Sequence, residues 1–148
     1  MFDTTPTFAL GRYALNLTRP QVMGILNITP DSFSDGARIA NAAEALAIAT
    51  QMIADGVDIL DVGGESTRPG AVPISLQEEL DRVMPVIEAL TALDKPISID
   101  TSKAEVMRAA TRAGAVLIND VYALRGEGAM AAAIESGAAV VLMHMQGE

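Results

Sequence analysis

The chain has 148 residues, enough for one domain with a real core, and 50% of them are hydrophobic, which argues against disorder. Its net charge of −9 argues against nucleic acid or an anionic membrane as a partner, and no segment approaches the length of a membrane span. Cysteine is absent, so disulfides, thiolate metal sites and a cysteine nucleophile are excluded. Residues 1–8 do not resemble a signal peptide, and we therefore expect a cytoplasmic protein.

Apolar segments and turn residues predict a small hairpin followed by five strands. Residues 8–10 and 13–17 flank Gly11 and Arg12, a pattern that favours a β-hairpin. The five apolar runs beyond it are largely continuous, as expected of parallel strands buried on both faces. These runs cover residues 21–28, 57–62, 96–99, 115–118 and 138–143.

The first two helices are expected between the first three of these strands. Apolar residues recur at helical spacing over residues 45–53, and Gly56 is a natural C-terminal stop. Ser75 and Glu78 form a capping-box pattern at the start of the second helix. Pro85 lies inside that helical pattern and predicts a kink or a later start.

The third and fourth helices are expected before the last two strands. Ser102 with Glu105 forms a second capping-box pattern, and the helix that it opens should end at Gly114. A weaker helix is predicted over about residues 129–136, ending at Gly137.

Repeated strand–helix units either close into a barrel or remain an open doubly wound sheet. A complete (β/α)8 barrel needs about 250 residues. We therefore interpret residues 1–148 as a partial α/β domain, about the first half of a (β/α)8 TIM barrel. It would comprise the hairpin, four strand–helix units and a fifth strand. An open five-stranded sheet is the alternative.

Polar side chains stand at the end of every expected strand. In a barrel such residues converge on one mouth, where these folds keep their chemistry. The alternative is that they are turn residues, a common use of Asp and Asn. In chain order they are Asn27, Asp61 and Glu65, Asp100, Asn119 and His144.

Two of these residues suit the recognition of a flat heterocycle. Asp100 shares a strand face with Ser98, and a carboxylate there can accept two parallel hydrogen bonds from the NH–C–NH₂ edge of a pteridine or guanine. Asp100 could instead cap the helix near Ser102. Asn119 offers donors and an acceptor to another edge of the ring. Met143 could form an apolar wall for a flat ring, although core packing is the commoner use of methionine.

Two loops add candidates for anion and metal binding. Asn27 ends the first strand with a neutral oxygen, which could complete a magnesium shell together with diphosphate oxygens and water. The glycine-rich segment 63–70 allows close backbone approach, and Arg68, its only cation, can bind a carboxylate or phosphate. Arg68 could equally be an ordinary solvent-exposed loop side chain with no ligand.

Four motifs and a shorter fifth then carry a family resemblance. They resemble the successive signatures of the dihydropteroate synthases, in that family's order and approximate spacing, from about Met23 onwards. The segments are MGILNITPDSFSDG, DILDVGGESTRPGA, SIDTSKAEV, LINDV and MHMQG.

The resemblance implies a TIM-barrel transferase of folate biosynthesis. Such an enzyme joins 6-hydroxymethyl-7,8-dihydropterin diphosphate to p-aminobenzoate and releases pyrophosphate, with Mg²⁺. By the family pattern, Asp100 and Asn119 would hold the pterin ring, and Asn27 would meet magnesium or the diphosphate. A homodimer is implied for the full-length enzyme.

The resemblance also implies roles for loop residues. Thr67, Arg68 and Pro69 would lie near p-aminobenzoate and the diphosphate, with Arg68 sharing the catalytic role with Asp100. Phe33 and Asp35 would belong to a first loop that builds the p-aminobenzoate pocket.

The resemblance is incomplete. The family's Asp-Pro-Gly, Ser-Arg-Lys and Arg-x-His segments do not occur here, and Ala37 replaces a frequent glycine. We therefore expect these 148 residues alone not to catalyse the condensation. One alternative is a pterin-binding methyltransferase-type barrel, although residues 66–70 argue against it. A second is a non-catalytic pterin-binding half-barrel that pairs with another chain. The third is a partial gene product without function.

Overall fold

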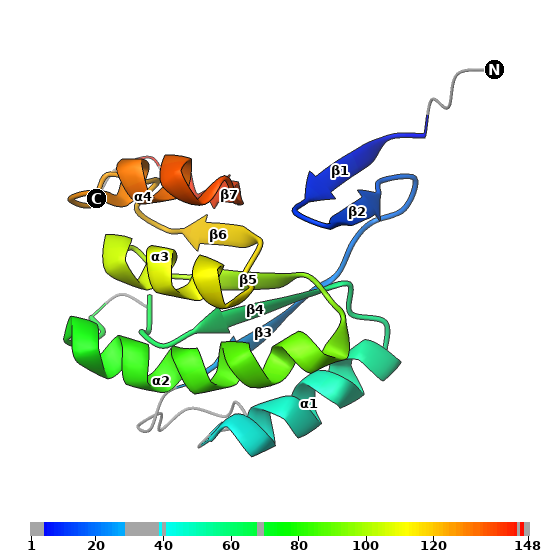
Figure 1. Ribbon diagram of the computed structural model, residues 1–148, viewed down its shortest axis with the longest axis horizontal. Helices are drawn as coiled ribbons and strands as arrows, with labels where there is room; N and C mark the ends of the chain where they lie inside the picture. Colours follow the sequence, from blue (N-terminus) through cyan, green and yellow to red (C-terminus); the bar gives the residue numbers. More distant parts are fainter. Residues whose placement is uncertain (1–4, 29–38, 40, 68–69, 145, 147–148) are drawn as a thin grey trace.

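The computed structural model of the chain describes residues 5–28, 39, 41–67, 70–144 and 146, and shows a hairpin followed by alternating strands and helices (Figure 1). In chain order the elements are β1 (Thr7–Leu10), β2 (Tyr13–Asn16), β3 (Met23–Asn27), α1 (Ala42–Ala54), β4 (Ile59–Gly63), α2 (Leu76–Leu90), the 3₁₀ turn η1 (Thr91–Leu93), β5 (Ile97–Asp100), α3 (Ala104–Ala113), β6 (Leu117–Asp120), α4 (Ala129–Ser136) and β7 (Ala139–Leu142).

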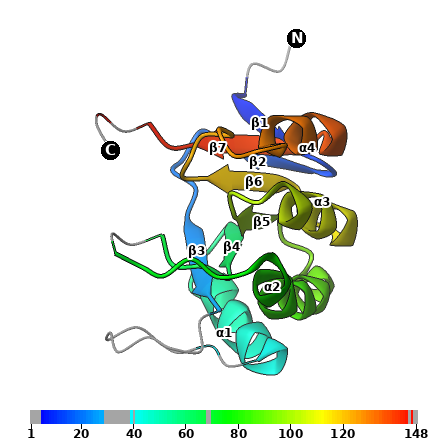
Figure 2. The same ribbon diagram turned by 90° about the vertical axis from the view of Figure 1, so that its left-hand side faces the viewer.

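The strands after the hairpin form one parallel sheet in the order β3-β4-β5-β6-β7. In the described part of the chain, the helices α1 to α4 lie on one face of this sheet, and each packs against the next along the chain (Figure 2). A doubly wound sheet would place helices on both faces and reverse its strand order. The arrangement is that of about half a (β/α)8 barrel, as predicted, and it is not the doubly wound sheet of the alternative.

The two faces of the sheet have different side chains because strand residues alternate. The helix-facing row runs in register through Leu26, Val62, Ile99 and Ile118, and each of these residues is fully buried. They join helix residues such as Ile87 in the main core. The opposite face, which is the inner face of a barrel, carries the polar residues considered below.

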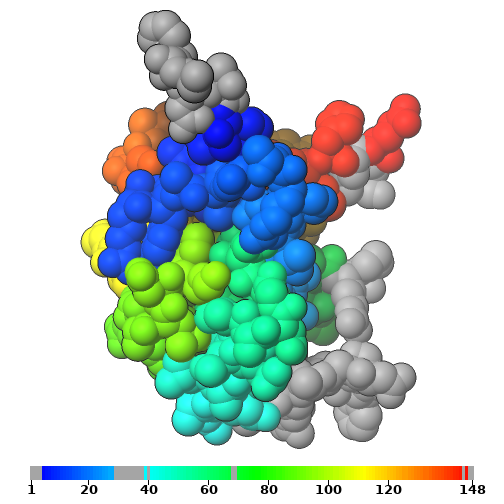
Figure 3. Space-filling model, turned by 90° about the vertical axis from the view of Figure 1, so that its right-hand side faces the viewer, coloured from blue at the N-terminus to red at the C-terminus, as the bar shows by residue number. Residues whose placement is uncertain are grey.

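The hairpin β1–β2 lies over the N-terminal ends of the strands (Figure 3). Its Leu10 forms a small second core with Ile59 of β4 and Leu117 of β6. Close to it, Arg19 donates two hydrogen bonds of 3.0 and 2.6 Å to the carboxylate of Asp58. This end of the sheet is therefore closed by packing and an ion pair.

Two sequence predictions about the second helix had different outcomes. The Ser75 hydroxyl accepts the N–H of Glu78 at 3.1 Å, which confirms the N-cap. The predicted later start at Pro85 is wrong, because α2 runs from Leu76 to Leu90 through the proline. Buried Val83 and Ile87 on either side of Pro85 pack into the core and hold the helix there.

The predicted N-cap of the third helix is also wrong. The cap position of α3 is Lys103, and it makes no side-chain capping bond. The backbone N–H of Lys103 donates a hydrogen bond of 3.2 Å to the hydroxyl of Thr101. Ser102, the predicted N-cap residue, does not cap the helix. The stops at Gly114 and Gly137 are confirmed, each glycine having a positive φ.

The edge strands expose apolar side chains on the inner face and at its rim. Ile25 of β3 is 57% exposed, and Val141 and Leu142 of β7 are also exposed. Within the described ranges, β3 and β7 each pair with a single neighbouring strand of the parallel sheet. No described helix combines the length and apolarity needed to cross a membrane.

Candidate pterin-binding site

The predicted polar residues at the strand ends lie in one row across the sheet. Register pairs Asn27 of β3 with Gly63 of β4, Gly63 with Asp100 of β5, and Asp100 with Asn119 of β6. Because the strands are parallel, these residues share the C-terminal edge of the sheet and point to its inner face. Three residues that are far apart in the sequence thus converge as predicted.

Asp100 occupies the centre of this row and is half-buried. Burial, and then the negative charges of Asp61, Asp120 and Glu79, raise the pKa of Asp100 to about 7. Its carboxylate makes no hydrogen bond within the described residues, and the proposed alternative role as a helix cap is absent. Asp100 is therefore a partly desolvated carboxylate with both oxygens available to a ligand.

Asn119 is oriented by a buried carboxylate one layer deeper in the sheet. Its Nδ2 donates a hydrogen bond of 3.2 Å to Oδ2 of Asp61, which is 2% exposed. Oδ1 of Asp61 and the hydroxyl of neighbouring Ser98 are buried with no hydrogen-bond partner within the described chain. Burial raises the pKa of Asp61, and the neighbouring Ser98 hydroxyl and then the Asn119 amide oppose that rise. Asp61 and Ser98 face each other on paired strands, so their polar atoms form a buried polar layer beneath the row.

Gly63 lies between Asn27 and Asp100 in this row, and its lack of a side chain leaves a space there. A Cβ at this position would lie 3.6 Å from Oδ1 of Asn27 and 3.6 Å from Oδ2 of Asp100. A larger residue would therefore fill the space between the two oxygens. The missing side chain leaves room for a ligand between Asn27 and Asp100.

A small pocket of about 30 Å³ adjoins Asp100 at the mouth. The loop after β4 and the loops after β5 and β6 supply its walls. Thr67 lies on the same pocket as Asp100, so the structure brings this loop residue to the site as expected. The lining residues are Glu65, Ser66, Thr67, Glu79, Asp100, Thr101, Ser102, Val121 and Tyr122.

Comparison with known proteins identifies the family of the chain. The profile of the "Pterin binding enzyme" family matches residues 23–148, most of the chain. The chain belongs to the pterin-binding enzyme family. The row of Asn27, Asp100 and Asn119 is therefore the candidate pterin-binding site of a family member.

Curated and solved relatives are dihydropteroate synthases. The enzyme of Escherichia coli K12 is 53% identical over 141 residues, which are 95% of this chain and 50% of that protein. The Yersinia pestis dihydropteroate synthase in complex with a sulfonamide drug superimposes with a TM-score of 0.91 at 53% identity, covering 97% of this chain and 52% of that one. The Xanthomonas albilineans enzyme with 4-aminobenzoic acid gives 0.87 at 52% identity, with coverage of 97% and 53%. The chain spans about half the length of the curated relatives it matches.

The remaining predicted residues of this pterin-binding enzyme fall into two groups. Met143 follows β7 and donates its backbone N–H to the Asp120 carbonyl at 3.3 Å, so it stands at the rim beside β6. His144 is exposed beside it. The residues outside the described part of the chain are Phe33, Asp35, Arg68 and Pro69.

Asp120, next to Asn119, has a structural role. Its carboxylate accepts the N–H groups of Tyr122 at 2.9 Å and Leu124 at 2.7 Å. These bonds hold a turn in which Ala123 and Leu124 have φ of 55° and 58°, a conformation that is unfavourable for both residues. Asp120 is therefore a turn residue rather than part of the row.

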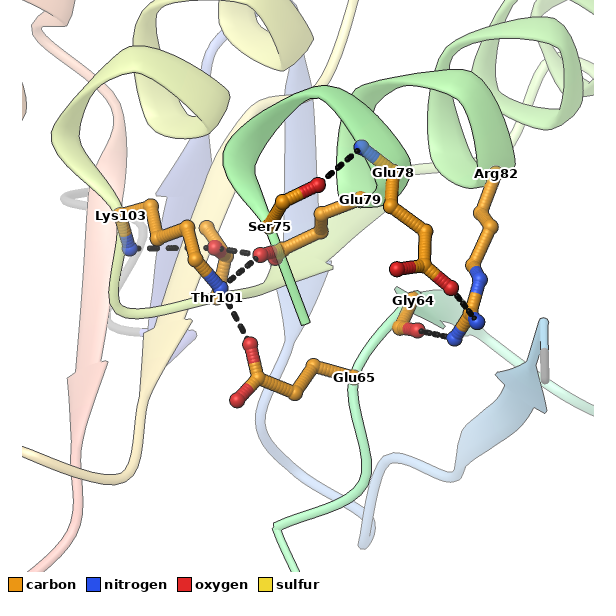
Figure 4. Close-up of polar contacts among 8 residues, drawn as sticks. All are labelled: Gly64, Glu65, Ser75, Glu78, Glu79, Arg82, Thr101 and Lys103. Atoms are coloured by element: carbon orange, nitrogen blue, oxygen red, sulfur yellow. Dashed lines mark hydrogen bonds and ion pairs between the residues drawn. The ribbon is translucent and has the colours of Figure 1, made fainter. Parts of the chain in front are cut away.

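Sequence reasoning missed a polar cluster beside the pocket. Lys103 at the start of α3 contacts the carboxylates of Glu79 on α2 and Glu65 in the loop after β4 (Figure 4). One signal was present, because Glu79 lies on the buried face of the helix, one turn before Val83. An acidic residue on an apolar helix face requires a buried partner.

Proposed function

We propose that this chain supplies the pterin-binding half of a dihydropteroate synthase. The reaction would join 6-hydroxymethyl-7,8-dihydropterin diphosphate to p-aminobenzoate, giving 7,8-dihydropteroate and pyrophosphate. The observation that carries the proposal is the row of Asn27, Asp100 and Asn119 on one sheet edge, in a chain 53% identical to the Escherichia coli enzyme.

Asp100 would bind the amidine-like edge of the pterin ring. Its oxygens are free of protein partners in the described structure, and two parallel N–H donors would satisfy both of them. The binding form is the carboxylate, and two ring N–H groups would favour that form. Asp100 would therefore become ionised on binding, although burial alone favours its neutral form.

Asn119 would bind another edge of the same ring. Because one hydrogen of its Nδ2 is engaged by Asp61, the orientation of the amide is fixed. Its Oδ1 is then presented as an acceptor, and the second Nδ2 hydrogen remains as a donor. The amide would thus select a ring edge with matching groups.

The chemical step needs no covalent enzyme nucleophile. The C–O bond between the pterin methylene and the diphosphate breaks, and its electron pair leaves with pyrophosphate. The amine lone pair of p-aminobenzoate forms the new C–N bond, and the amine then loses a proton. Positioning the two substrates and stabilising the leaving group would be the protein's main tasks. Thr67 from the mouth, with Arg68 and Pro69 next to it in the sequence, is assigned to that role by the resemblance.

Asn27 would contribute to a magnesium site only together with the substrate. No group of three His, Cys, Asp or Glu side chains that could hold a metal occurs in the described residues. Asn27 offers one neutral oxygen, which faces the same space above Gly63 as Oδ2 of Asp100. This donor set fits Mg²⁺ that is shared with diphosphate oxygens and water. When bound, the ion would neutralise charge on the departing diphosphate.

The same proposal includes a location in the cytoplasm and a homodimeric full-length enzyme. The cytoplasmic location expected from the sequence is kept in this proposal. A homodimer is implied by the family resemblance.

The direct test is a condensation assay on the longest reading frame that contains this chain. The proposal expects 7,8-dihydropteroate from the pterin diphosphate and p-aminobenzoate, with loss of product when Asp100→Asn is introduced. Methyl transfer from methyltetrahydrofolate in place of condensation would favour the methyltransferase alternative. Pterin binding without either reaction would favour a non-catalytic half-barrel.

A further inference from the structure

The loop after β4 is attached to two helices at its first two residues. Gly64 approaches α2 closely, and its carbonyl accepts a hydrogen bond of 2.8 Å from Arg82 Nη1. Glu65 then contacts the ammonium group of Lys103 at the start of α3 (Figure 4). Thr67 follows two residues later, at the pocket beside Asp100.

Lys103 is the centre of this attachment because it bridges two carboxylates. Besides Glu65, it donates at 2.6 Å to Glu79, whose side chain is 1% exposed. Thr101 donates its hydroxyl to the other Glu79 oxygen at 2.5 Å. Partial burial disfavours a charged lysine, but the contacts with Glu65 and Glu79 outweigh it, so the pKa of Lys103 is raised and the ammonium stays charged.

The bridge connects the two parts of the site. Thr101 directly follows Asp100 in the sequence and Lys103 lies three residues after it, while Glu65 directly precedes the segment of Ser66 and Thr67. A short charged contact between these segments fixes the distance between the ring-binding strand β5 and the loop after β4. Without the ammonium, Glu65 and Glu79 would repel each other across the pocket wall.

We propose that Lys103 is a positioning residue, which uses buried Glu79 as an anchor and holds Glu65, and with it Thr67, at the pocket beside Asp100. This inference deepens the proposed function and rests on it for the substrate assignment. Lys103 contacts no reacting atom in this account. It sets the geometry of the p-aminobenzoate and diphosphate side of the site rather than that of the pterin side.

The test compares Lys103→Met, Lys103→Arg and Glu65→Gln in the longest reading frame containing the chain. For Lys103→Met we expect kcat/KM for p-aminobenzoate to fall at least about tenfold while the Kd of the pterin substrate changes less than about threefold. Lys103→Arg should retain most of the wild-type kcat/KM, because arginine keeps the positive charge and the hydrogen-bond donors. Amides of residues 65–67 should exchange hydrogen faster in Lys103→Met, and those of β5 should not.

The matched control is Arg108→Met, which removes an ion pair with Glu135 between α3 and α4, away from the pocket. It should leave both kinetic constants and the exchange at residues 65–67 unchanged. If Lys103→Met does not fold, the same measurements on Glu65→Gln test the inference. This variant removes the charge of the partly exposed Glu65 and so weakens the same bridge.

Unchanged p-aminobenzoate kinetics in a folded bridge variant would overturn the inference. A loss of pterin affinity as large as the loss in p-aminobenzoate kinetics would also overturn it, because that result would indicate a general structural role. A wild-type protein that does not condense the substrates would instead contradict the proposed function. In that case the exchange at residues 65–67 still tests the bridge, and equal rates in wild type and Lys103→Met would overturn it.

Discussion

The Asn119 side chain on β6 donates a hydrogen bond of 3.2 Å to Asp61 on β4, reaching over the intervening strand β5. The acceptor is almost fully buried, so this bond is shielded from water. It orients the amide that we assign to the pterin ring and places a carboxylate beneath Asp100. The negative charge of Asp61 is one cause of the raised pKa of Asp100.

Asp61 should act on pterin binding through Asn119 and Asp100. Asp61→Leu removes the acceptor that orients the amide, and we expect the pterin Kd to weaken about tenfold. Asp61→Asn keeps a carbonyl acceptor but removes the charge, so affinity should be nearly retained while the pKa of Asp100 falls. Calorimetric titrations across pH check both effects. Equal affinities in wild type and Asp61→Leu would contradict the orienting role.

Pterin affinity should depend on pH through Asp100. The pKa of the free carboxyl is raised to about 7, and the ring N–H donors bind the ionised form. Affinity should therefore be highest above pH 7 and weaken about tenfold per pH unit well below it. The wild type is measured from pH 5.5 to 8.5, with Asp100→Asn as the control that lacks this dependence. A flat wild-type profile would refute the role of an ionised Asp100.

Asp58 should stabilise the fold without serving the site. Its carboxylate accepts two bonds from Arg19 and one of 2.9 Å from the Val22 N–H, at the N-terminal ends of the strands. Asp58→Ala leaves both donors without this partner and should lower the free energy of unfolding by about 1–3 kcal/mol, measured by urea denaturation. Pterin affinity at a temperature where the variant is folded should not change. Loss of affinity there would show that the two ends of the sheet are coupled.

The same ion pair predicts how this contribution varies with pH. The hydrogen bonds from Arg19, and then that from Val22, lower the pKa of Asp58 below its ordinary value of 3.8. A carboxyl with a lowered pKa stabilises the folded state above the unfolded value and loses that effect as the pH falls. The stability difference between wild type and Asp58→Ala should therefore be constant near neutral pH and shrink below about pH 4. A difference that grows as the pH falls would contradict this assignment.

Arg68 and Asp100 should affect different substrates. The family resemblance implies that Arg68 would serve the diphosphate and p-aminobenzoate, whereas Asp100 would bind the ring. Arg68→Ala should therefore reduce turnover or raise the KM for p-aminobenzoate about tenfold or more, with a smaller effect on pterin affinity. Steady-state kinetics together with pterin titrations separate these effects. Pterin affinity lost equally in Arg68→Ala and Asp100→Asn would contradict the division.

Most of the architecture could be predicted from apolar periodicity and glycine stops. The hairpin, the five strands and the end of α3 at Gly114 depend on local pattern, which the fold respects. The start of α3 could not be predicted, because Thr101, rather than Ser102, accepts the Lys103 N–H. The path of α2 through Pro85 depends on tertiary packing, which outweighs local propensity.

The site was partly predictable for a similar reason. Asn27, Asp100 and Asn119 end parallel strands, so their convergence follows from the topology once the strands are known. The bridge from Lys103 to Glu79 joins different elements, and no spacing in the sequence reveals such a contact. Only the acidic side chain on the buried face of α2 indicated that a partner existed.

The most direct test of the central claim is dihydropteroate formation by the longest reading frame that contains this chain. Purified wild type and Asp100→Asn are supplied with the pterin diphosphate, p-aminobenzoate and Mg²⁺, and residues 1–148 alone are assayed in parallel. We predict product from the wild type, a large loss in Asp100→Asn, and none from the 148 residues alone. A wild type that forms no dihydropteroate, or an Asp100→Asn variant with full activity and pterin affinity, would contradict the account.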